Sequence, residues 1–403
     1  MARVRQLFIW VLLAALLFGA HLSWRETRYG RGPQDHSGDL TGPGREIAFV
    51  SNVVEGSVSM VDLATYQVID TLDVVPDGKR VGLFRDPLQW LAQGYLESRG
   101  GLNFAQDTDL SRDGRVLYVS RGYLGDVAAF DIASGGVLWR TPVSGMRADH
   151  MDISPDGRRL YVSALIYGGN IVEVLDAASG DHLGAFPTGL WPHDVHTSHD
   201  GARVYAASLG NMLKDGAERD AEPNAYSVTV VDAVSLGRLK SHRFESGVRP
   251  FVFNRDETRL YAQLSNAHAL VSYDLKAGRH LGRLELPIDQ GVTEADWDFE
   301  APHHGLALTP DESTLCVAGR ASDYAALVRI AGDQLATEAV IDVGDAPSWA
   351  TLDLDGGRCL LPNTRSNDLS IISIAEQREL VRVRVGAAPK HVTVGRVPAS
   401  LLN

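Results

Sequence analysis

The sequence predicts an all-β fold in which seven units of four antiparallel strands close into a ring. Three observations support this: a recurring strand–turn–strand pattern, a regular spacing between its copies, and two incomplete ends that complement each other. In ADHMDISPDGRRLYVSA (148–164), alternating apolar residues lead into an Asp-Gly turn and then a strand rich in Leu, Tyr and Val. Related stretches place their turn aspartates at Asp113, Asp156, Asp200, Asp256, Asp311 and Asp355.

The spacing of these turns identifies the repeat unit. Consecutive turn aspartates are separated by 43, 44, 56, 55 and 44 residues. Each unit reads as strand a, the turn, strand b, a strand c ending in Asp as in IVEVLD (171–176), and strand d. A period in the forties with four short strands is typical of a β-propeller blade.

The two ends of the repeat region predict how the ring closes. The N-terminal part supplies only strands b, c and d, as IAFVSN, SVSMVDL and QVIDTLDV, and the C-terminal part supplies only a strand a, PKHVTVGRV (389–397). With six complete strand-a copies this makes seven blades, and the last strand should complete the first blade. Closure of this kind removes the free sheet edges that invite aggregation.

The motifs SPDGRRLYVS and VGAAPKHVTVGRV resemble those of the YVTN-repeat family, also described as YncE-like or surface-layer-type propellers. The resemblance covers residues 45–397. It implies a seven-bladed β-propeller that is exported and is often found near redox or cofactor proteins. It implies no shared catalytic residue, because the repeat motif specifies the fold and not the function.

Four regions are expected along the chain. Residues 1–24 carry Arg3 and Arg5 before an uncharged apolar run, which is the layout of a signal peptide or an uncleaved signal anchor. Residues 25–44 form a flexible Gly/Pro-rich tether, 45–397 the propeller and 398–403 a tail. We therefore expect an extracytoplasmic monomer, periplasmic or at the cell surface, that meets the membrane only through its N-terminal segment.

Composition excludes some partners. The net charge of −13, without a basic run in the propeller, argues against nucleic acid. The two cysteines, Cys316 and Cys359, fall in strands of adjacent blades, one position apart in the repeat. Because neighbouring positions of a strand point to opposite faces, the sequence predicts two buried free thiols.

Three insertions interrupt the period, and all three should lie on one rim of the ring. They span residues 76–105, 209–225 and 287–302. The first and third join strand d to strand a, and the second joins strand b to strand c, so antiparallel geometry places them together. Extra chain on one face of a rigid scaffold is typical of a binding site.

Strand a begins on the same rim, beside the central channel. Seven residues before each turn aspartate, the chain reads Gln106, Asp149, His193, Arg249, His304 and Ser348, with Lys390 in the closing strand. One position later it reads Asp107, His150, Asp194, Pro250, Gly305, Trp349 and His391. The expected ligand-binding residues at the channel mouth are Asp149, His150, His193, Asp194, Arg249, His304, Trp349, Lys390 and His391.

The histidines of this ring admit three uses. His150, His193, His304 and His391 could hold Cu, Fe or Zn, could act in acid–base chemistry, or could bond neighbouring backbone. Because histidines of opposite blades should be too far apart to share one ion, His150 and His193 are the expected pair. His199 is expected to lie in solvent at the opposite rim.

Other groups near the mouth have alternatives of their own. Arg249 and Lys390 could bind a carboxylate or phosphate, or could pair with Asp149 or Asp194. In a separate loop, Asp296, Asp298 and Glu300 are candidates for a calcium ligand or a general base, or form a solvated loop. Residues 86–97 predict an amphipathic helix with Leu88, Leu91, Leu96, Trp90 and Tyr95 on its packing face, as a lid over the mouth or as ordinary rim packing.

No nucleophile elbow, phosphate loop or dinucleotide fingerprint is present, so no catalytic residue is assigned. The first hypothesis is a propeller that binds a small ligand, cofactor or partner protein at the mouth without catalysis. The alternative is a metal- or tetrapyrrole-dependent oxidoreductase or lyase that uses the histidines. A third is a surface interaction protein that binds partners through its outer blade edges.

Overall fold

The computed structural model describes residues 13, 33–83, 86–100, 102–145, 147–165, 170–214, 216–222, 225–297 and 300–402. Apart from Leu13, the predicted signal or anchor (1–24) lies outside the described residues, as does the first part of the predicted tether (25–32). Within the described ranges, no helix is both long enough and apolar enough to cross a membrane.

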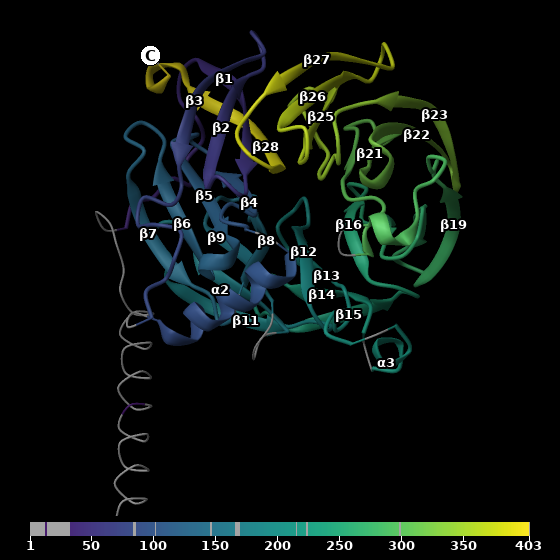
Figure 1. Cartoon of the computed structure of the whole chain (residues 1–403), viewed down its shortest axis with the longest axis horizontal. Coiled ribbons are helices and arrows are strands. Elements are labelled where there is room, and N and C mark those ends of the chain that lie inside the picture. Colours follow the sequence, from purple (N-terminus) through teal and green to yellow (C-terminus); the bar gives the residue numbers. More distant parts are fainter. Residues whose placement is uncertain are drawn as a thin grey trace, which may run out of the picture.

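Seven four-stranded antiparallel sheets surround a central axis, which confirms the predicted fold (Figure 1). The innermost strands a are β28 (Pro389–Pro398), β4 (Asp107–Leu110), β8 (Arg147–Ile153), β12 (Pro192–Thr197), β16 (Val248–Phe253), β20 (Leu306–Leu308) and β24 (Thr351–Leu352). Strands b are β1 (Gly44–Asn52), β5 (Val116–Arg121), β9 (Arg159–Leu165), β13 (Arg203–Ser208), β17 (Arg259–Leu264), β21 (Thr314–Gly319) and β25 (Arg358–Asn363).

The outer half of each blade follows the same order. Strands c are β2 (Ser57–Asp62), β6 (Asp126–Asp131), β10 (Ile171–Asp176), β14 (Ser227–Asp232), β18 (Ala269–Asp274), β22 (Tyr324–Ala331) and β26 (Asp368–Ser373). Strands d are β3 (Gln67–Asp73), β7 (Val137–Pro142), β11 (His182–Pro187), β15 (Arg238–Arg243), β19 (Arg279–Glu285), β23 (Gln334–Asp342) and β27 (Arg378–Arg384). Strands b and c are largely buried and strands d largely exposed, because the apolar core lies between facing blades.

The ring closes as the sequence predicts. The last strand, β28, pairs antiparallel with β1 from Gly44↔Pro398 to Asn52↔Pro389, so the two ends of the chain share one sheet (Figure 1). The short 3₁₀ helix η5 (Ala399–Leu401) follows β28, and Leu401 packs against the apolar cluster beneath β1. All seven blades therefore have four strands.

The Asp-Gly turns between strands a and b owe their sequence to backbone geometry. In the turn after β8, the Asp156 side chain accepts hydrogen bonds from the Ser154 hydroxyl (2.6 Å) and the Arg158 backbone N–H (3.1 Å). Gly157 has φ +71°, a left-handed conformation that favours glycine. The recurring Asp-Gly motif is thus a structural turn. His199 lies in the equivalent turn after β12 and is exposed, as expected.

The three insertions share one rim, as predicted. The first contains α2 (Pro87–Gly100), and Gln89 donates from Nε2 to the carbonyl of Tyr123 (2.9 Å) in η1 (Gly122–Leu124), a b–c connection. The second contains α3 (Gly216–Asp220), whose Arg219 forms an ion pair with Glu300 (2.6 Å) of the third insertion, beyond η2 (Glu294–Asp296). A last 3₁₀ helix, η4 (Arg320–Ser322), lies on a b–c connection of this same rim.

The helix α2 is present, but its predicted packing face is wrong. Gln89, Ala92 and Gln93 are buried against the rim, and Gln93 Oε1 accepts from the Val81 backbone N–H (3.0 Å). The apolar residues assigned to that face are exposed instead, namely Leu88, Trp90, Leu91 and Tyr95, and the Leu96 side chain lies outside the described residues. Amide side chains bury here because they satisfy loop backbone groups, which apolar side chains cannot do.

The prediction of two free thiols is also wrong, because Cys316 and Cys359 form a disulfide. Their Cα atoms are 6.5 Å apart, and both residues belong to one apolar cluster between the blades of β21 and β25. Within a single sheet, a one-position offset in the repeat points the two side chains to opposite faces. In stacked blades it does the reverse, since opposite faces of successive sheets are the ones that meet.

The opposite rim carries the described part of the N-terminal segment. His36 Nδ1 lies 2.8 Å from Asp113 Oδ2 in an a–b turn, and the Gln34 backbone N–H donates to the carbonyl of Ala178 (3.2 Å). A cavity of 610 Å³ opens on this side, lined by residues that include Asp39, Asp109 and Arg396. This cavity lies on the rim opposite the histidine-bearing ends of the strands.

Candidate metal centre

Bulges in the inner strands place the ring residues at the channel mouth. The pairing of β8 with β9 shifts register between Ala148 and Met151, and β12 shifts similarly between Pro192 and Val195. A bulge releases consecutive residues from the ladder and changes the direction of their side chains. Asp149 and His150 therefore both serve the channel mouth, as do His193 and Asp194, although strict strand alternation would allow only one residue of each pair.

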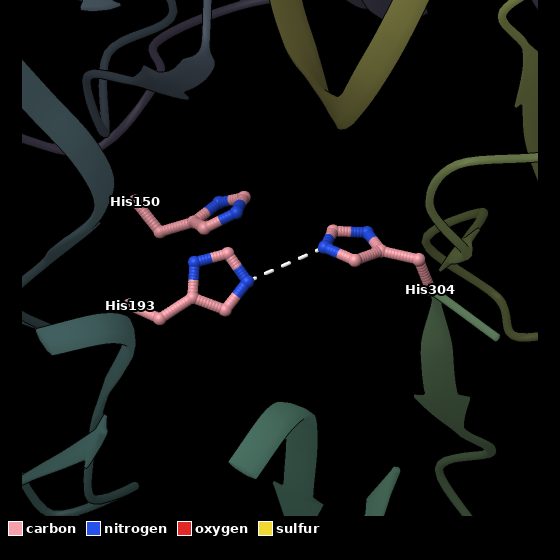
Figure 2. Close-up of side chains that lie close together, drawn as sticks. All are labelled: His150, His193 and His304. Atoms are coloured by element: carbon pink, nitrogen blue, oxygen red, sulfur yellow. Dashed lines mark hydrogen bonds between the residues drawn. The ribbon is translucent and has the colours of Figure 1, made fainter. Parts of the chain in front are cut away.

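Three histidines from three blades converge at the mouth (Figure 2). His150, His193 and His304 are all buried, and each offers a ring nitrogen such that the three nitrogens lie within 4.8 Å of one another. The Nε2 atoms of His193 and His304 are 3.3 Å apart, and the rings of His150 and His193 are 4.7 Å apart between centroids. The expectation that histidines of opposite blades lie too far apart to share an ion is wrong for His150 and His304, because their long side chains reach across the narrow channel.

The other ring nitrogen of each histidine is held by a hydrogen-bond acceptor. His150 Nδ1 lies 3.0 Å from Asp107 Oδ2, and His193 Nδ1 lies 2.7 Å from Asp149 Oδ2. His304 Nδ1 lies 2.8 Å from the carbonyl oxygen of Ser348. In each case the acceptor comes from a neighbouring blade, so contacts between blades orient the three rings.

These partners fix the tautomers of His193 and His304. A carbonyl oxygen can only accept, so His304 donates from Nδ1 and its neutral ring has a lone pair at Nε2. The Asp149 carboxylate imposes the same tautomer on His193, since Arg147 and His193 outweigh the effect of burial and hold the pKa of Asp149 well below its usual range. The Nε2 atoms of His193 and His304, which are 3.3 Å apart, therefore direct their lone pairs at each other.

Burial keeps both of these rings neutral. It lowers the pKa of His193 to about 4, despite Asp149, and it lowers the pKa of His304 well below the ordinary value. No proton is therefore available at neutral pH to bridge the facing lone pairs. A cation placed between them would satisfy both.

His150 differs in having a hydrogen-bond donor at Nε2. Gln106 Nε2 lies 3.2 Å from His150 Nε2, while Gln106 Oε1 accepts from Lys390 Nζ (3.2 Å) and Arg147 Nη2 (2.8 Å). These two cations fix the orientation of the amide, so its NH₂ group donates to His150. In its neutral form His150 therefore has a lone pair at Nε2, but Asp107 outweighs burial and raises the pKa of this ring, so a metal ion must displace a proton there.

The remaining predicted residues surround this cluster. Trp349 stacks on His150 with ring centroids 4.6 Å apart, and His391 Nδ1 lies 2.8 Å from Asp107 Oδ1. His391 thus shares the Asp107 carboxylate with His150, and Asp107, His150 and His391 form a second group with metal-ligand spacing beside the trio. Asp194 accepts from the Phe251 backbone N–H and pairs with His196, both at 3.1 Å.

His196 is an unsuitable metal ligand despite its place in the same strand as His193. Burial opposes its charge, but Asp194 outweighs this and raises the pKa of His196 to about 9. A protonated imidazole has no free lone pair for a metal. Of His193, His196 and His199, which lie within seven positions of the sequence, only His193 therefore belongs to the cluster.

The predicted cations are at the mouth, but they contact other partners than the expected carboxylates. Lys390 donates to Gln106, and Arg249 donates from Nε to the Ser265 hydroxyl (2.9 Å). Arg147, which the sequence reasoning did not single out, is the residue that pairs with Asp149, at 3.1 Å. It could have been found, because Arg147 and Asp149 are two positions apart on one strand.

The acidic loop residues have local partners. Asp296 Oδ2 accepts from the backbone N–H and the hydroxyl of Thr293, which caps η2, and Glu300 pairs with Arg219. Asp298 lies outside the described residues. These contacts give Asp296 and Glu300 structural partners at the rim.

Backbone contacts set the position of His304. Gln263 accepts from the Gly305 backbone N–H (2.8 Å) and donates to the Gly305 carbonyl (3.1 Å). A Cβ atom on Gly305 would lie 2.4 Å from the Trp349 backbone carbon, so only glycine fits beside His304. Sequence reasoning missed the roles of Gln106 and Gln263, because amides carry no strong motif signal.

Comparisons with solved structures show the same fold over most of the chain. Hydrazine synthase of Kuenenia stuttgartiensis is similar with a TM-score of 0.61 and 19% identity, covering 87% of this chain and 99% of that one. The periplasmic gluconolactonase PpgL of Pseudomonas aeruginosa gives 0.59 and 18%, covering 88% and 99%. Dihydro-heme d1 dehydrogenase NirN, in complex with DHE, gives 0.57 and 11%, covering 89% and 68%.

These identities are low enough that the likeness concerns the fold alone. No protein-family model matches the sequence, and no curated protein sequence matches it either. Propellers of this architecture thus include proteins whose names denote cofactor binding or enzymatic activity. The chain is a seven-bladed β-propeller.

Proposed function

We propose that this protein is an extracytoplasmic propeller that binds a transition-metal ion through His150, His193 and His304, and a small ligand beside it. The observation that carries the proposal is the pair of facing lone pairs on His193 and His304, 3.3 Å apart in neutral rings. Such an arrangement is unfavourable unless a cation lies between them. Imidazole suits Zn, Cu and Fe, the metals the sequence suggested.

The distances support direct coordination. With a metal–imidazole bond of about 2.0–2.1 Å, two ligands of a tetrahedral ion lie roughly 3.3 Å apart. Histidines that bind metals usually donate their second ring N–H to a carboxylate or a backbone carbonyl. All three histidines here have such an acceptor within 3.0 Å at Nδ1. Binding through His150 requires the Gln106 amide to give up its hydrogen bond to that ring.

A metal-dependent oxidoreductase or lyase is the second candidate. Three protein ligands with an open position are typical of catalytic rather than structural zinc sites. A tetrapyrrole held between His193 and His304 fits less well. Axial ligands on its two sides lie roughly 4 Å apart, twice a metal–imidazole bond, which exceeds the 3.3 Å between these nitrogens. The separation therefore favours a bare ion, whatever the relation to NirN in fold.

Two observations support an extracytoplasmic location. The Cys316–Cys359 disulfide suits an oxidising compartment, because thiols are kept reduced in the cytosol. The gluconolactonase of the same fold is named as periplasmic. The arginines and apolar run of residues 1–24, the resemblance to exported YVTN-like propellers and the predicted tether agree with export.

Metal titration of the purified full-length chain tests the proposal. After removal of metal with a chelator, Co²⁺ should bind at one equivalent, give the visible absorption of a low-coordinate imidazole complex, and be displaced by Zn²⁺. Substitutions His193→Ala and His304→Ala should each weaken binding more than the 10–100-fold typical of losing an outer partner. The exposed His199→Ala is the control. Folded wild-type protein that binds no Co²⁺, Zn²⁺ or Cu²⁺ would refute the metal centre.

A further inference from the structure

Four cationic side chains from different blades gather around the histidine cluster. They are Arg147 on β8, Arg249 on β16, Arg320 on η4 and Lys390 on β28. Burial and the charges of the three arginines lower the pKa of Lys390 to about 7, even though Asp149 opposes them. Lys390 and Arg249 in turn contribute to the low pKa of His304. Arg147 and Lys390 meet at the Gln106 amide oxygen, and Arg249 and Arg320 lie near enough for their charges to act on Lys390.

Three hydrogen-bond donors crowd one acceptor oxygen beside Arg147 and Lys390, while two buried acceptors nearby, Asp149 Oδ1 and Asn103 Oδ1, have no hydrogen-bond partner among the described residues. The single amide oxygen of Gln106 lies within hydrogen-bond distance of Asn103 Nδ2 (2.5 Å), Arg147 Nη2 (2.8 Å) and Lys390 Nζ (3.2 Å). An amide oxygen has two lone pairs, so three donors exceed its capacity. Arg147 Nε is buried and, among the described residues, has no hydrogen-bond partner. Buried donors of charged groups are seldom left unpaired.

The local charge is also unbalanced. Asp149 is the carboxylate that pairs with Arg147, through Oδ1 at 3.1 Å, and its Oδ2 is occupied by His193 at 2.7 Å. Lys390 has three N–H donors, and its described acceptor is the neutral Gln106. Burying a cation without a counter-charge is unfavourable, so a bound anion would be stabilised here and would keep Lys390 protonated.

We propose that Arg147 and Lys390 form a binding site for an oxyanion, a carboxylate or phosphate group carried by the small molecule that the mouth accepts. The two cations flank one amide, and a guanidinium presents paired donors that match an oxyanion. This inference rests on the proposed function for its biological ligand. Its physical basis, the unpaired donors and unbalanced charge, is separate from the three imidazoles.

Gln106 connects the oxyanion site to the metal centre. Its Oε1 faces the two cations and its Nε2 faces His150 at 3.2 Å. A ligand whose anionic group is held by Arg147 and Lys390 therefore lies one side chain away from the metal-binding nitrogens. Small acids and phosphate esters would be selected, and neutral compounds of the same size would leave the two cations without an acceptor.

Anion titration of the full-length chain tests the inference, with acetate and inorganic phosphate as separate probes. Calorimetry on both metal-free and Zn²⁺-loaded protein should detect one weak site, and comparison of the two probes distinguishes a carboxylate from a phosphate ligand. Lys390→Met should weaken binding at least tenfold, whereas Lys390→Arg should retain it. The control Arg396→Met removes an exposed cation at the other end of the same strand.

The outcomes separate this inference from the metal centre. No saturable binding of either anion, or equal binding by wild type and Lys390→Met, would overturn the oxyanion site even if Zn²⁺ binds normally. Anion binding by wild type without Zn²⁺ binding would overturn the metal centre alone. If Lys390→Met fails to fold, Lys390→Gln, which keeps a polar contact to Gln106, provides the same comparison.

Discussion

Removal of the Cys316–Cys359 disulfide should destabilise the propeller by about 4 kcal/mol. The two cysteines are 43 residues apart, and the chain-entropy relation for a closed loop of this length gives roughly 13 cal/mol/K, or about 4 kcal/mol at 25 °C. The bond joins two successive blades through their strands b. It therefore restrains the unfolded chain over a loop about as long as one repeat.

Equilibrium unfolding in urea measures this difference. Oxidised wild type, wild type reduced with a phosphine, and the Cys316→Ala/Cys359→Ala double variant should be compared at one pH. Reduced wild type keeps every sulfur atom, so it separates the loss of the cross-link from the loss of buried volume. Equal stability of oxidised and reduced wild type would refute the reasoning, as would labelling of both cysteines by a thiol reagent in native protein secreted to an oxidising compartment.

Two further predictions concern single side chains. Asp149→Asn removes the charge that orients His193, so it should weaken Co²⁺ affinity 10–100-fold, about 1.4–2.7 kcal/mol. The turn variant Asp156→Asn should change this affinity little. Unchanged affinity in Asp149→Asn would show that the carboxylate does not position the ring. Burial lowers the pKa of His242 to about 4, so the unfolded state binds more protons below pH 6.5 and stability falls as the pH drops. Between pH 7 and pH 5.5, the free energy of unfolding measured in urea should fall by about 1 kcal/mol less in His242→Leu than in wild type. An equal fall in the two proteins would contradict this account.

The fold could be predicted because its signals are local and repeated. A turn such as Ser154–Gly157 needs an aspartate to bind its own backbone and a residue that tolerates positive φ. The pattern is therefore written out in nearly every blade. Ring closure by residues 389–397 followed from counting the strands. Contacts between blades were harder to predict, because they depend on which faces of two sheets meet. A one-position offset separates two side chains within one sheet, but it brings Cys316 and Cys359 together between two sheets.

The site was predictable as a region and only partly as a geometry. Equivalent positions of strand a identified His150, His193 and His304, since a repeat that places a different polar residue in each blade has been diversified for a local purpose. The bulges at Ala148–Met151 and Pro192–Val195 leave no clear sequence signal, yet they determine that both residues of each pair reach the channel. His193 and His304 meet because their side chains reach across the channel axis. Strand periodicity gives no information about the distance between these two side chains.

The same hydrogen bonds that orient the histidines also join successive blades. Asp107 on β4 holds His150 on β8, Asp149 on β8 holds His193 on β12, and the Ser348 carbonyl in the next blade holds His304. The strands of a blade pack mainly against those of the two neighbouring blades, so each of these bonds resists separation of one blade pair at the channel. An ion bound by the three imidazoles would connect non-adjacent blades across the axis, which no strand pairing in the ring does. Because a ligand that binds only the folded state stabilises it in proportion to its affinity, metal binding at this position would strengthen ring closure as well as provide a chemical centre. In the proposed metal-bound state, the ring and the centre would therefore depend on each other through the same three side chains.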